Sequence, residues 1–339
     1  MIPPLLAELV LAHGASGYED AVQAVVRREA AAMGATVAND VLGSTVATIA
    51  GTAGGRTLAL FAHADQIGLA VRDAGEDGLL SVGQLAAWSS AAAAQQRVRI
   101  MTKAGEIRGV VVPPEGEPAW DGLRVDIGAR DRSHALELVR PGDPIVLHGP
   151  PESLPNGRIL SAALDDRIGI YAGLELLRRL AADPPSWDIA LVVTGQEETS
   201  THAGARVAAE RLAPDVAIVL EVTYAGDAPG TAPWGGDIRL GGGPALFRGP
   251  VVSPVVTDGL LGVAAENGIA VAVETGKATH SDTDDIFATG AGVACGMVSI
   301  PLRYMHSAGE VVQLSDVDDA LRLIEAYARS LRSESSFLR

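Results

Sequence analysis

The chain has 339 residues, of which 26 are basic and 42 acidic, giving a net charge of −16. This acidic balance argues against a nucleic acid or an anionic membrane as a partner, and no uncharged apolar stretch reaches the roughly 18 residues of a transmembrane helix. The single cysteine, Cys295, excludes an intrachain disulfide framework and favours a reducing, cytoplasmic compartment.

The first part of the chain predicts helices that alternate with strands. The apolar residues between positions 5 and 10 have helical spacing, and the absence of a basic start or a small-residue cleavage pattern argues against a signal peptide. Residues 18–34 predict an amphipathic helix, and residues 37–49 predict a strand and a turn. Residues 56–62 form an apolar run that predicts a buried strand.

The pattern changes after Gly68 to short apolar runs that are broken by glycine, proline and aspartate. Runs at Gln96–Met101, Ile107–Val112 and Pro144–Leu147 are typical of a small β-barrel or sandwich. Because the length exceeds that of a usual single domain, we expect two domains. We place a β-rich insertion at residues 69–155 and a catalytic domain at residues 1–68 and 156–339.

From residue 156 onward, apolar strands again alternate with helical patterns. The predicted helices lie at residues 166–181, 201–212, 257–267 and 316–332. This alternation predicts an α/β fold with a mixed, mostly parallel sheet that helices cover on both faces. The glycines at 241–243 lack the spacing of a phosphate-binding loop and predict a turn.

Side chains that can bind metals follow the ends of the predicted buried strands. Each of them would also fit a purely structural role, as a core histidine, a helix cap or a solvated loop residue. In an open α/β sheet, however, sites lie beyond the carboxyl ends of the strands, so these side chains are expected to converge. They are His63 and Asp65 after 56–62, Glu197 and Glu198 after 188–194, Glu221 after 216–220, His306 after 294–301, and Asp165 and Asp166 before the helical pattern of residues 168–180.

Two histidines with several carboxylates form a nitrogen and oxygen ligand set that suits zinc, cobalt or manganese. A metal-assisted hydrolase also needs a carboxylate that is not a ligand, because the attacking water must lose a proton. Glu197, which stands beside the expected ligand Glu198, is the candidate for this general base.

With these residues in place, the sequence resembles the tetrahedral aminopeptidases, a family of dinuclear metallopeptidases that includes glutamyl aminopeptidases. The matching motifs cover nearly the whole chain in the order of the family. They are Gly14–Glu19 (GASGYE), His63–Gly68 (HADQIG), Val125–Ala129 (VDIGA), Pro141–Asp143 (PGD), Ala163–Gly169 (ALDDRIG), Gln196–Glu198 (QEE), Leu240–Pro244 (LGGGP), and Arg303–His306 (RYMH) with Glu310.

The resemblance implies a role for each site residue. Asp165 would bridge two divalent ions, His63 and Glu221 would complete one metal site, and Glu198 and His306 would complete the other. Asp65 would orient the ring of His63, and Glu197 would activate a metal-bridging water. The peptide bond between Asp165 and Asp166 is expected to be cis.

The resemblance also implies peptide substrates, cleaved at the N-terminus, and a homo-oligomer, with a dodecameric tetrahedral cage as the expected form. The β-rich insertion would take part in this assembly. The segment 112–123 is shorter than in the family, so an assembly contact made through that loop is not expected to be retained.

The sequence departs from the family near the expected base. The segment Thr199–Ala205 lacks the family's arginine and brings in His202, and Glu221 stands where the family has an aspartate. The segment Thr279–Asp285 keeps only the Thr-Asp pair of a glycine-rich motif. The first two differences predict altered surroundings for the base. For the last segment, two interpretations stay open: His280, Asp282 and Asp285 reshape a substrate pocket, or they form a capped turn before the apolar run.

Two other functions fit the same residues. A dinuclear carboxypeptidase or deacylase would share the metal site, and a non-catalytic assembly subunit would share the fold, although the complete ligand set and Glu197 argue against it. A polysaccharidase that relies on paired carboxylates leaves both histidines unused.

Overall fold

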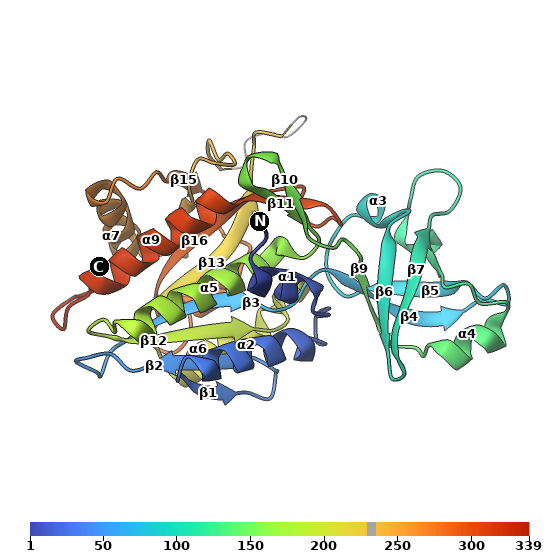
Figure 1. Ribbon diagram of the computed structural model, residues 1–339, viewed down its shortest axis with the longest axis horizontal. Coiled ribbons are helices and arrows are strands. Elements are labelled where there is room, and N and C mark those ends of the chain that lie inside the picture. The colour runs from blue at the N-terminus through green and yellow to red at the C-terminus, as the bar shows by residue number, and fades with distance from the viewer. Residues whose placement is uncertain (229–234, 339) are drawn as a thin grey trace.

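The computed structural model describes residues 1–228 and 235–338, and Figure 1 shows their arrangement. A large sheet with its helices forms one body, and the strands between β4 and β9 form a smaller one beside it. Within these described ranges, no helix has the length and apolar character needed to cross a membrane.

The helices and strands fall into three groups along the chain. Before the barrel come α1 (Pro4–Leu11), α2 (Asp20–Ala32), β1 (Thr36–Asn39), β2 (Thr45–Ile49) and β3 (Thr57–His63). The barrel region holds β4 (Gly68–Ala74), β5 (Leu80–Gln84), α3 (Ser90–Ala93), β6 (Arg97–Thr102), β7 (Gly105–Val112), η1 (Trp120–Gly122), β8 (Arg124–Asp126), α4 (Arg132–Leu138) and β9 (Pro144–Leu147). After it come β10 (Glu152–Leu154), η2 (Pro155–Gly157), β11 (Arg158–Ser161), α5 (Leu164–Ala182), β12 (Asp188–Thr194), η3 (Glu197–Thr201), α6 (Ala203–Leu212), β13 (Val216–Tyr224), β14 (Ala245–Arg248), α7 (Pro254–Glu266), β15 (Ala272–Thr275), α8 (Thr283–Ile286), β16 (Ala294–Arg303), β17 (Glu310–Gln313) and α9 (Leu314–Ser330).

The large sheet is parallel at its centre and antiparallel toward its edges. Its strands run in the order β1-β2-β12-β3-β13-β16-β17-β11-β10, and β14 and β15 pair beside β16. The central strands β12, β3, β13 and β16 are parallel to their neighbours within this group. The predicted α/β class with a mixed sheet is confirmed.

Both faces of this sheet are buried, which explains why its strands read as continuous apolar runs. Successive residues of β3 alternate between the faces: Leu58 and Leu60 pack in the core that contains α5 and α9, whereas Ala59 and Phe61 pack with the alanines of α6. The helices therefore cover the sheet on both sides, and its strand ends are left for the site.

The region after β3 forms a closed barrel rather than a sandwich. Its strands run in the order β4-β5-β8-β7-β6-β9, and β4 also pairs with β9, with Leu69 opposite Ile145. The barrel has its own apolar core, which is separate from that of the sheet. The next strand, β10, pairs with β11 in the large sheet, so the barrel strands end at Leu147. The division into a catalytic and an inserted domain stays a prediction.

Two features of the sheet differ from the sequence interpretation. The strand predicted to end at Leu220 continues to Tyr224, so Glu221 lies inside β13 rather than after it. The short strands β14, β15 and β17 were not predicted, because four residues with mixed burial carry no clear periodicity.

Candidate active site

The predicted site residues converge at the carboxyl ends of the central strands. His63 is the last residue of β3, Glu197 and Glu198 open the π-helical turn η3 after β12, and His306 follows β16. Parallel pairing aligns these ends, since Thr194 of β12 lies opposite His63. The start of α5 lies against the same edge of the sheet.

The carboxylate of Asp165 lies between two histidines. Its Oδ1 is 3.1 Å from Nε2 of His63, and its Oδ2 is 3.3 Å from Nε2 of His306. The side chain is 7% exposed, so both contacts are shielded from water. Each oxygen of one carboxylate therefore faces a different half of the cluster.

A glutamate completes each half. Oε1 of Glu221 lies 3.7 Å from Nε2 of His63, and Oε2 of Glu198 lies 3.4 Å from Nε2 of His306. Potential ligand atoms of His63, Asp165 and Glu198 lie within 4.8 Å of one another. The five side chains predicted as ligands thus lie in one cluster.

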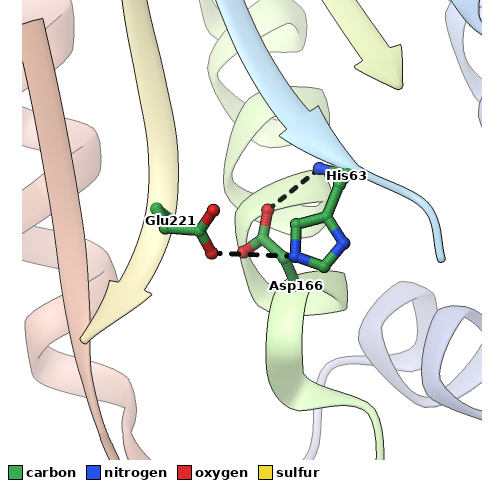
Figure 2. A group of neighbouring side chains, drawn as sticks. All are labelled: His63, Asp166 and Glu221. Carbon is green, nitrogen blue, oxygen red and sulfur yellow. Dashed lines mark hydrogen bonds and ion pairs between the residues drawn. The ribbon is translucent and has the colours of Figure 1, made fainter. Parts of the chain in front are cut away.

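Asp166 also lies in this cluster, although no ligand role was predicted for it. Figure 2 shows Asp166, His63 and Glu221 converging from α5, β3 and β13, and their potential ligand atoms lie within 4.8 Å of one another. Its oxygens accept hydrogen bonds from the backbone N–H groups of His63, at 3.2 Å, and Gly169, at 3.1 Å. A Cβ atom at Gly169 would lie 2.4 Å from this carboxylate, so only glycine fits there.

The peptide bond between Asp165 and Asp166 is cis, as expected from the resemblance. In the sequence, the feature that could have indicated Asp166 as a further ligand is its position directly after Asp165.

Glu310 supports the cluster from behind, a role that the sequence interpretation did not assign. It accepts hydrogen bonds from the backbone N–H groups of Asp165, at 3.2 Å, and His306, at 2.9 Å. Burial and the nearby charge of Asp165 raise the pKa of Glu310 to about 8. The Glu310 carboxylate thereby connects the start of α5, which carries Asp165, to the loop after β16, which carries His306.

Asp65 is fully buried and contacts the segments around it. Its carboxylate accepts hydrogen bonds from the Ser16 hydroxyl at 2.6 Å and from the backbone N–H groups of Glu197 and Glu198. Its Oδ1 lies 3.4 Å from Nδ1 of His63, and its backbone carbonyl oxygen lies 3.1 Å from the same nitrogen. These contacts fix both the η3 turn and the imidazole ring.

Glu197 occupies a turn whose backbone geometry is unusual. Gln196 and His202, on either side of η3, have φ values of 65° and 40°. The following helix α6 packs closely on this turn, because a Cβ atom at Gly204 would lie 2.4 Å from the carbonyl oxygen of Gly195. Oε2 of Glu197 is 4.0 Å from Nε2 of His63, so the carboxylate faces the cluster.

Negative charge accumulates in this buried space. Burial and the charge of Asp165 raise the pKa of Glu198 well above its usual value, and burial and the charge of Asp166 do the same for Glu221. Burial alone lowers the pKa of His306, but its contacts with Asp165 and Glu198 outweigh burial and raise the pKa to about 10. The carboxylates therefore compete for too few positive partners.

The donor set fits divalent cations. Oε1 of Glu198 is buried and has no hydrogen-bond partner in the described structure. Among the described residues, the ion pairs of Asp165, Glu198 and Glu221 are made with histidines only. Imidazole nitrogens and carboxylate oxygens are the ligands that zinc, cobalt and manganese accept, and a cation would satisfy the unpaired oxygen.

The cluster lines a cavity of about 720 Å³. Ala87, which precedes α3 in the barrel region, also reaches the cavity wall. Among the described lining residues, none is a lysine or an arginine, whereas further acidic side chains, Glu274 and Asp284, contribute to the wall. The cavity is therefore acidic as well as large enough for a small ligand.

Comparisons with known proteins agree with this geometry. The model of the M42 glutamyl aminopeptidase family matches residues 43–323. The lysyl aminopeptidase of Pyrococcus furiosus is 32% identical over 354 residues, which cover 97% of each chain.

Solved structures are also similar to this chain over nearly its whole length. A TET aminopeptidase from a marine sediment Thaumarchaeota archaeon has a TM-score of 0.93 at 29% identity and covers 97% of this chain and 96% of its own. The TET1 peptidase of Pyrococcus horikoshii, which can assemble into a tetrahedron or a large octahedral shell, has a TM-score of 0.85 at 26% identity, with 96% and 99% covered. From its fold, its strand-end cluster and these matches, the chain belongs to the M42 glutamyl aminopeptidase family.

Proposed function

We propose that this protein is a metal-dependent aminopeptidase that holds two divalent cations, zinc or cobalt with manganese as a third candidate, and uses Glu197 as its general base. The observation that carries the proposal is the position of Asp165, whose two oxygens face His63 and His306 at 3.1 and 3.3 Å. A carboxylate placed in this way suits a bridge between two cations.

The remaining ligands divide between the two halves of the cluster. His63 and Glu221 would complete one cation site, and Glu198 and His306 would complete the other, with the unpaired Oε1 of Glu198 as a free ligand atom. Bound cations supply the polarisation of the scissile carbonyl and the acidification of water. Asp65 holds the ring of His63 in place through the contacts at Nδ1.

Glu197 handles the proton. Its carboxylate faces the cluster, takes one proton from the attacking water as the oxygen bonds to the carbonyl carbon, and delivers it to the amine nitrogen as the C–N bond breaks. Its placement directly before a ligand, in a turn held by Asp65, keeps it close to the reacting atoms without making it a ligand.

The cavity favours the amino end of a peptide over the carboxyl end. A carboxypeptidase needs a cationic side chain to bind the terminal carboxylate, and none of the described lining residues is a lysine or an arginine. An acidic wall instead attracts the protonated amine of a peptide N-terminus. This charge balance supports the aminopeptidase over the carboxypeptidase that the sequence left open.

The test is a panel of aminoacyl-chromophore substrates after reconstitution with zinc, cobalt and manganese in parallel. Substrates with a free amine should be cleaved, and their N-acetylated counterparts should not. Preference for acetylated or carboxyl-terminal substrates would overturn the assignment of the amino end. Stoichiometric metal without turnover on any peptide would instead favour an assembly subunit.

We further propose that the chain forms a homo-oligomer, with a dodecamer as the expected form. The support is the similarity to structures described as a dodecamer and as a tetrahedron or octahedral shell. Size-exclusion chromatography with light scattering should give a mass near twelve times the 34.8 kDa of the chain. A monomer at micromolar concentration would contradict the proposal.

A further inference from the structure

His202 lies next to the proposed base, Glu197. It stands between η3 and α6, with a φ of 40°, in the left-handed region that side chains other than glycine rarely adopt. Its side chain is 12% exposed and lines the same cavity as the carboxylate cluster. A non-glycine residue in this conformation at the wall of a site is a candidate for a functional constraint.

Each ring nitrogen of His202 faces a different carboxylate. Nδ1 lies 2.7 Å from Oδ2 of Asp285 in α8, and Nε2 lies 3.5 Å from Oε1 of Glu197. The other oxygen of Glu197, Oε2, is the one that faces His63 at 4.0 Å. His202 therefore contacts one oxygen of the Glu197 carboxylate, and the other oxygen faces the carboxylate cluster.

These contacts define the protonation that the ring needs. At 2.7 Å from the Asp285 carboxylate, Nδ1 carries the hydrogen of this contact, so Nε2 must also be protonated to donate toward Glu197. Burial opposes a charged ring, but the hydrogen bond and charge of Glu197 outweigh it, followed by the charge of Asp282 and the bond to Asp285, and they raise the pKa of His202 to about 9. The ring is accordingly an imidazolium at neutral pH.

Asp285 is itself held in place by its helix. It lies in α8, which packs against α6 and β16, and the preceding Asp282 accepts a hydrogen bond from the Thr194 hydroxyl at 2.6 Å at the end of β12. The ring of His202 is thus fixed from the side of α8 before any substrate arrives.

We propose that His202 is a positioning residue for the base: it holds Oε1 of Glu197 so that Oε2 faces the reacting atoms, and Asp285 fixes the ring that does this. The inference rests on the proposed function, because it assumes that Glu197 is the base. It adds an acid–histidine–acid arrangement whose members come from η3, the start of α6 and α8.

Two amide substitutions separate this role from a purely structural one. The amide nitrogen of glutamine can stand in for Nε2 and reach Glu197, whereas that of asparagine can stand in for Nδ1 and reach Asp285. Because each of these variants loses a hydrogen bond to the charged carboxylate of Glu197, kcat should fall about tenfold or more in His202→Ala and His202→Asn. His202→Gln should retain most of the wild-type kcat, and KM should change little in all three variants.

The measurements are kcat and KM on a free-amine chromogenic substrate, together with metal content and thermal unfolding of each variant. His134→Ala is the control, since His134 lies in α4 of the barrel region, where its Nδ1 accepts a hydrogen bond from the nearby backbone N–H of Arg130. It should match the wild type. If asparagine restores kcat better than glutamine, His202 acts by anchoring α8, and the proposal is overturned.

The same substitutions in a Glu197→Gln background separate this inference from the proposed function. If His202 acts through Glu197, then His202→Ala should lower kcat no further once Glu197 is replaced, because the two residues act as a unit. Full activity of Glu197→Gln alone would sink the proposed base. A strongly impaired Glu197→Gln beside an unimpaired His202→Ala would sink only the role of His202.

Discussion

The carboxylate of Asp65 accepts a hydrogen bond from the backbone N–H of Glu197 at 2.9 Å, so the loop after β3 holds the turn that carries the proposed base. Asp65 itself is fully buried. The positions of the base and of the His63 ring thus depend on one side chain that does not face the cavity.

Replacing Asp65 by asparagine should loosen this turn. The carboxylate accepts three hydrogen bonds, from Ser16, Glu197 and Glu198, and an asparagine NH₂ group would face at least one of these donors. An unpaired buried donor destabilises a protein by about 1–3 kcal/mol, so both the melting temperature and kcat should fall. Thermal unfolding and steady-state kinetics check this, with the exposed Asp318→Asn as a control that should change neither.

Replacing Glu197 by glutamine should remove the proposed base and leave the capacity to bind metal unchanged. General acid–base catalysis contributes about 10²–10⁴-fold, so kcat should fall on that order. Metal analysis should find a content near that of the wild type, because Glu197 is not a proposed ligand. Loss of activity only in step with loss of metal would make Glu197 a coordinating residue.

Replacing His306 by alanine should empty or weaken one of the two proposed cation sites. Its Nε2 lies within 3.4 Å of both Asp165 and Glu198, and the coordination shell is incomplete without it. Metal content measured after dialysis should drop for one of the two sites. Unchanged content at both sites would contradict the ligand assignment.

Replacing Gly204 by alanine should displace α6 from the turn of the base. The new Cβ atom would lie 2.4 Å from the carbonyl oxygen and 2.7 Å from the nitrogen of Gly195, both of which are backbone atoms. Such overpacking destabilises by about 1–3 kcal/mol, and kcat should fall because η3 moves.

Gly262→Ala in α7 is the matched control, since a Cβ atom there meets nothing within 4 Å. Alanine is favoured over glycine in a helix by about 1 kcal/mol, so this variant should be as stable as the wild type or more so. Equal stability losses in both variants would show that the close contact at Gly204 is unimportant.

The stability of the protein should fall on mild acidification because of His13. Burial, followed by the positive charges of Arg99 and Arg167, lowers the pKa of His13 to about 3. In the unfolded chain, the histidine ring binds a proton near pH 6.5. The free energy of unfolding should therefore fall by about 1.4 kcal/mol per pH unit as the pH falls from 6.5 toward 3, and His13 should not affect it above pH 6.5.

Denaturant unfolding at pH 7.5 and 5.5 measures this effect. The free energy of unfolding of the wild type should fall more between these pH values than that of His13→Gln, which has no proton to bind. Equal pH dependence in the two proteins would contradict the buried neutral state of His13.

The fold was predictable from the sequence where burial makes a continuous pattern. The apolar runs of β3, β12 and β16 and the helical spacing of α5 and α9 were recognised, because both faces of the sheet and one face of each helix are buried. The short strands β14, β15 and β17 were missed, since a run of four residues carries little periodicity.

The sequence indicated which residues gather at the site better than it indicated the contacts between them. Strand ends placed the ligand candidates at one edge, but the sequence could not say that each oxygen of Asp165 faces a different histidine. His202 was noticed as an unusual residue, yet its partner Asp285 lies 83 residues away, a separation that no local pattern spans.

The closed barrel also limits how copies of this chain can associate. Because β4 pairs with β5 on one side and β9 on the other, each of the six barrel strands has a neighbour on both sides. This closure disfavours a continuous sheet that would run from the barrel of one subunit into that of the next. Contacts between copies at the barrel would then be made by side chains and loops. A single substitution there can change which surface the barrel binds without disrupting a strand.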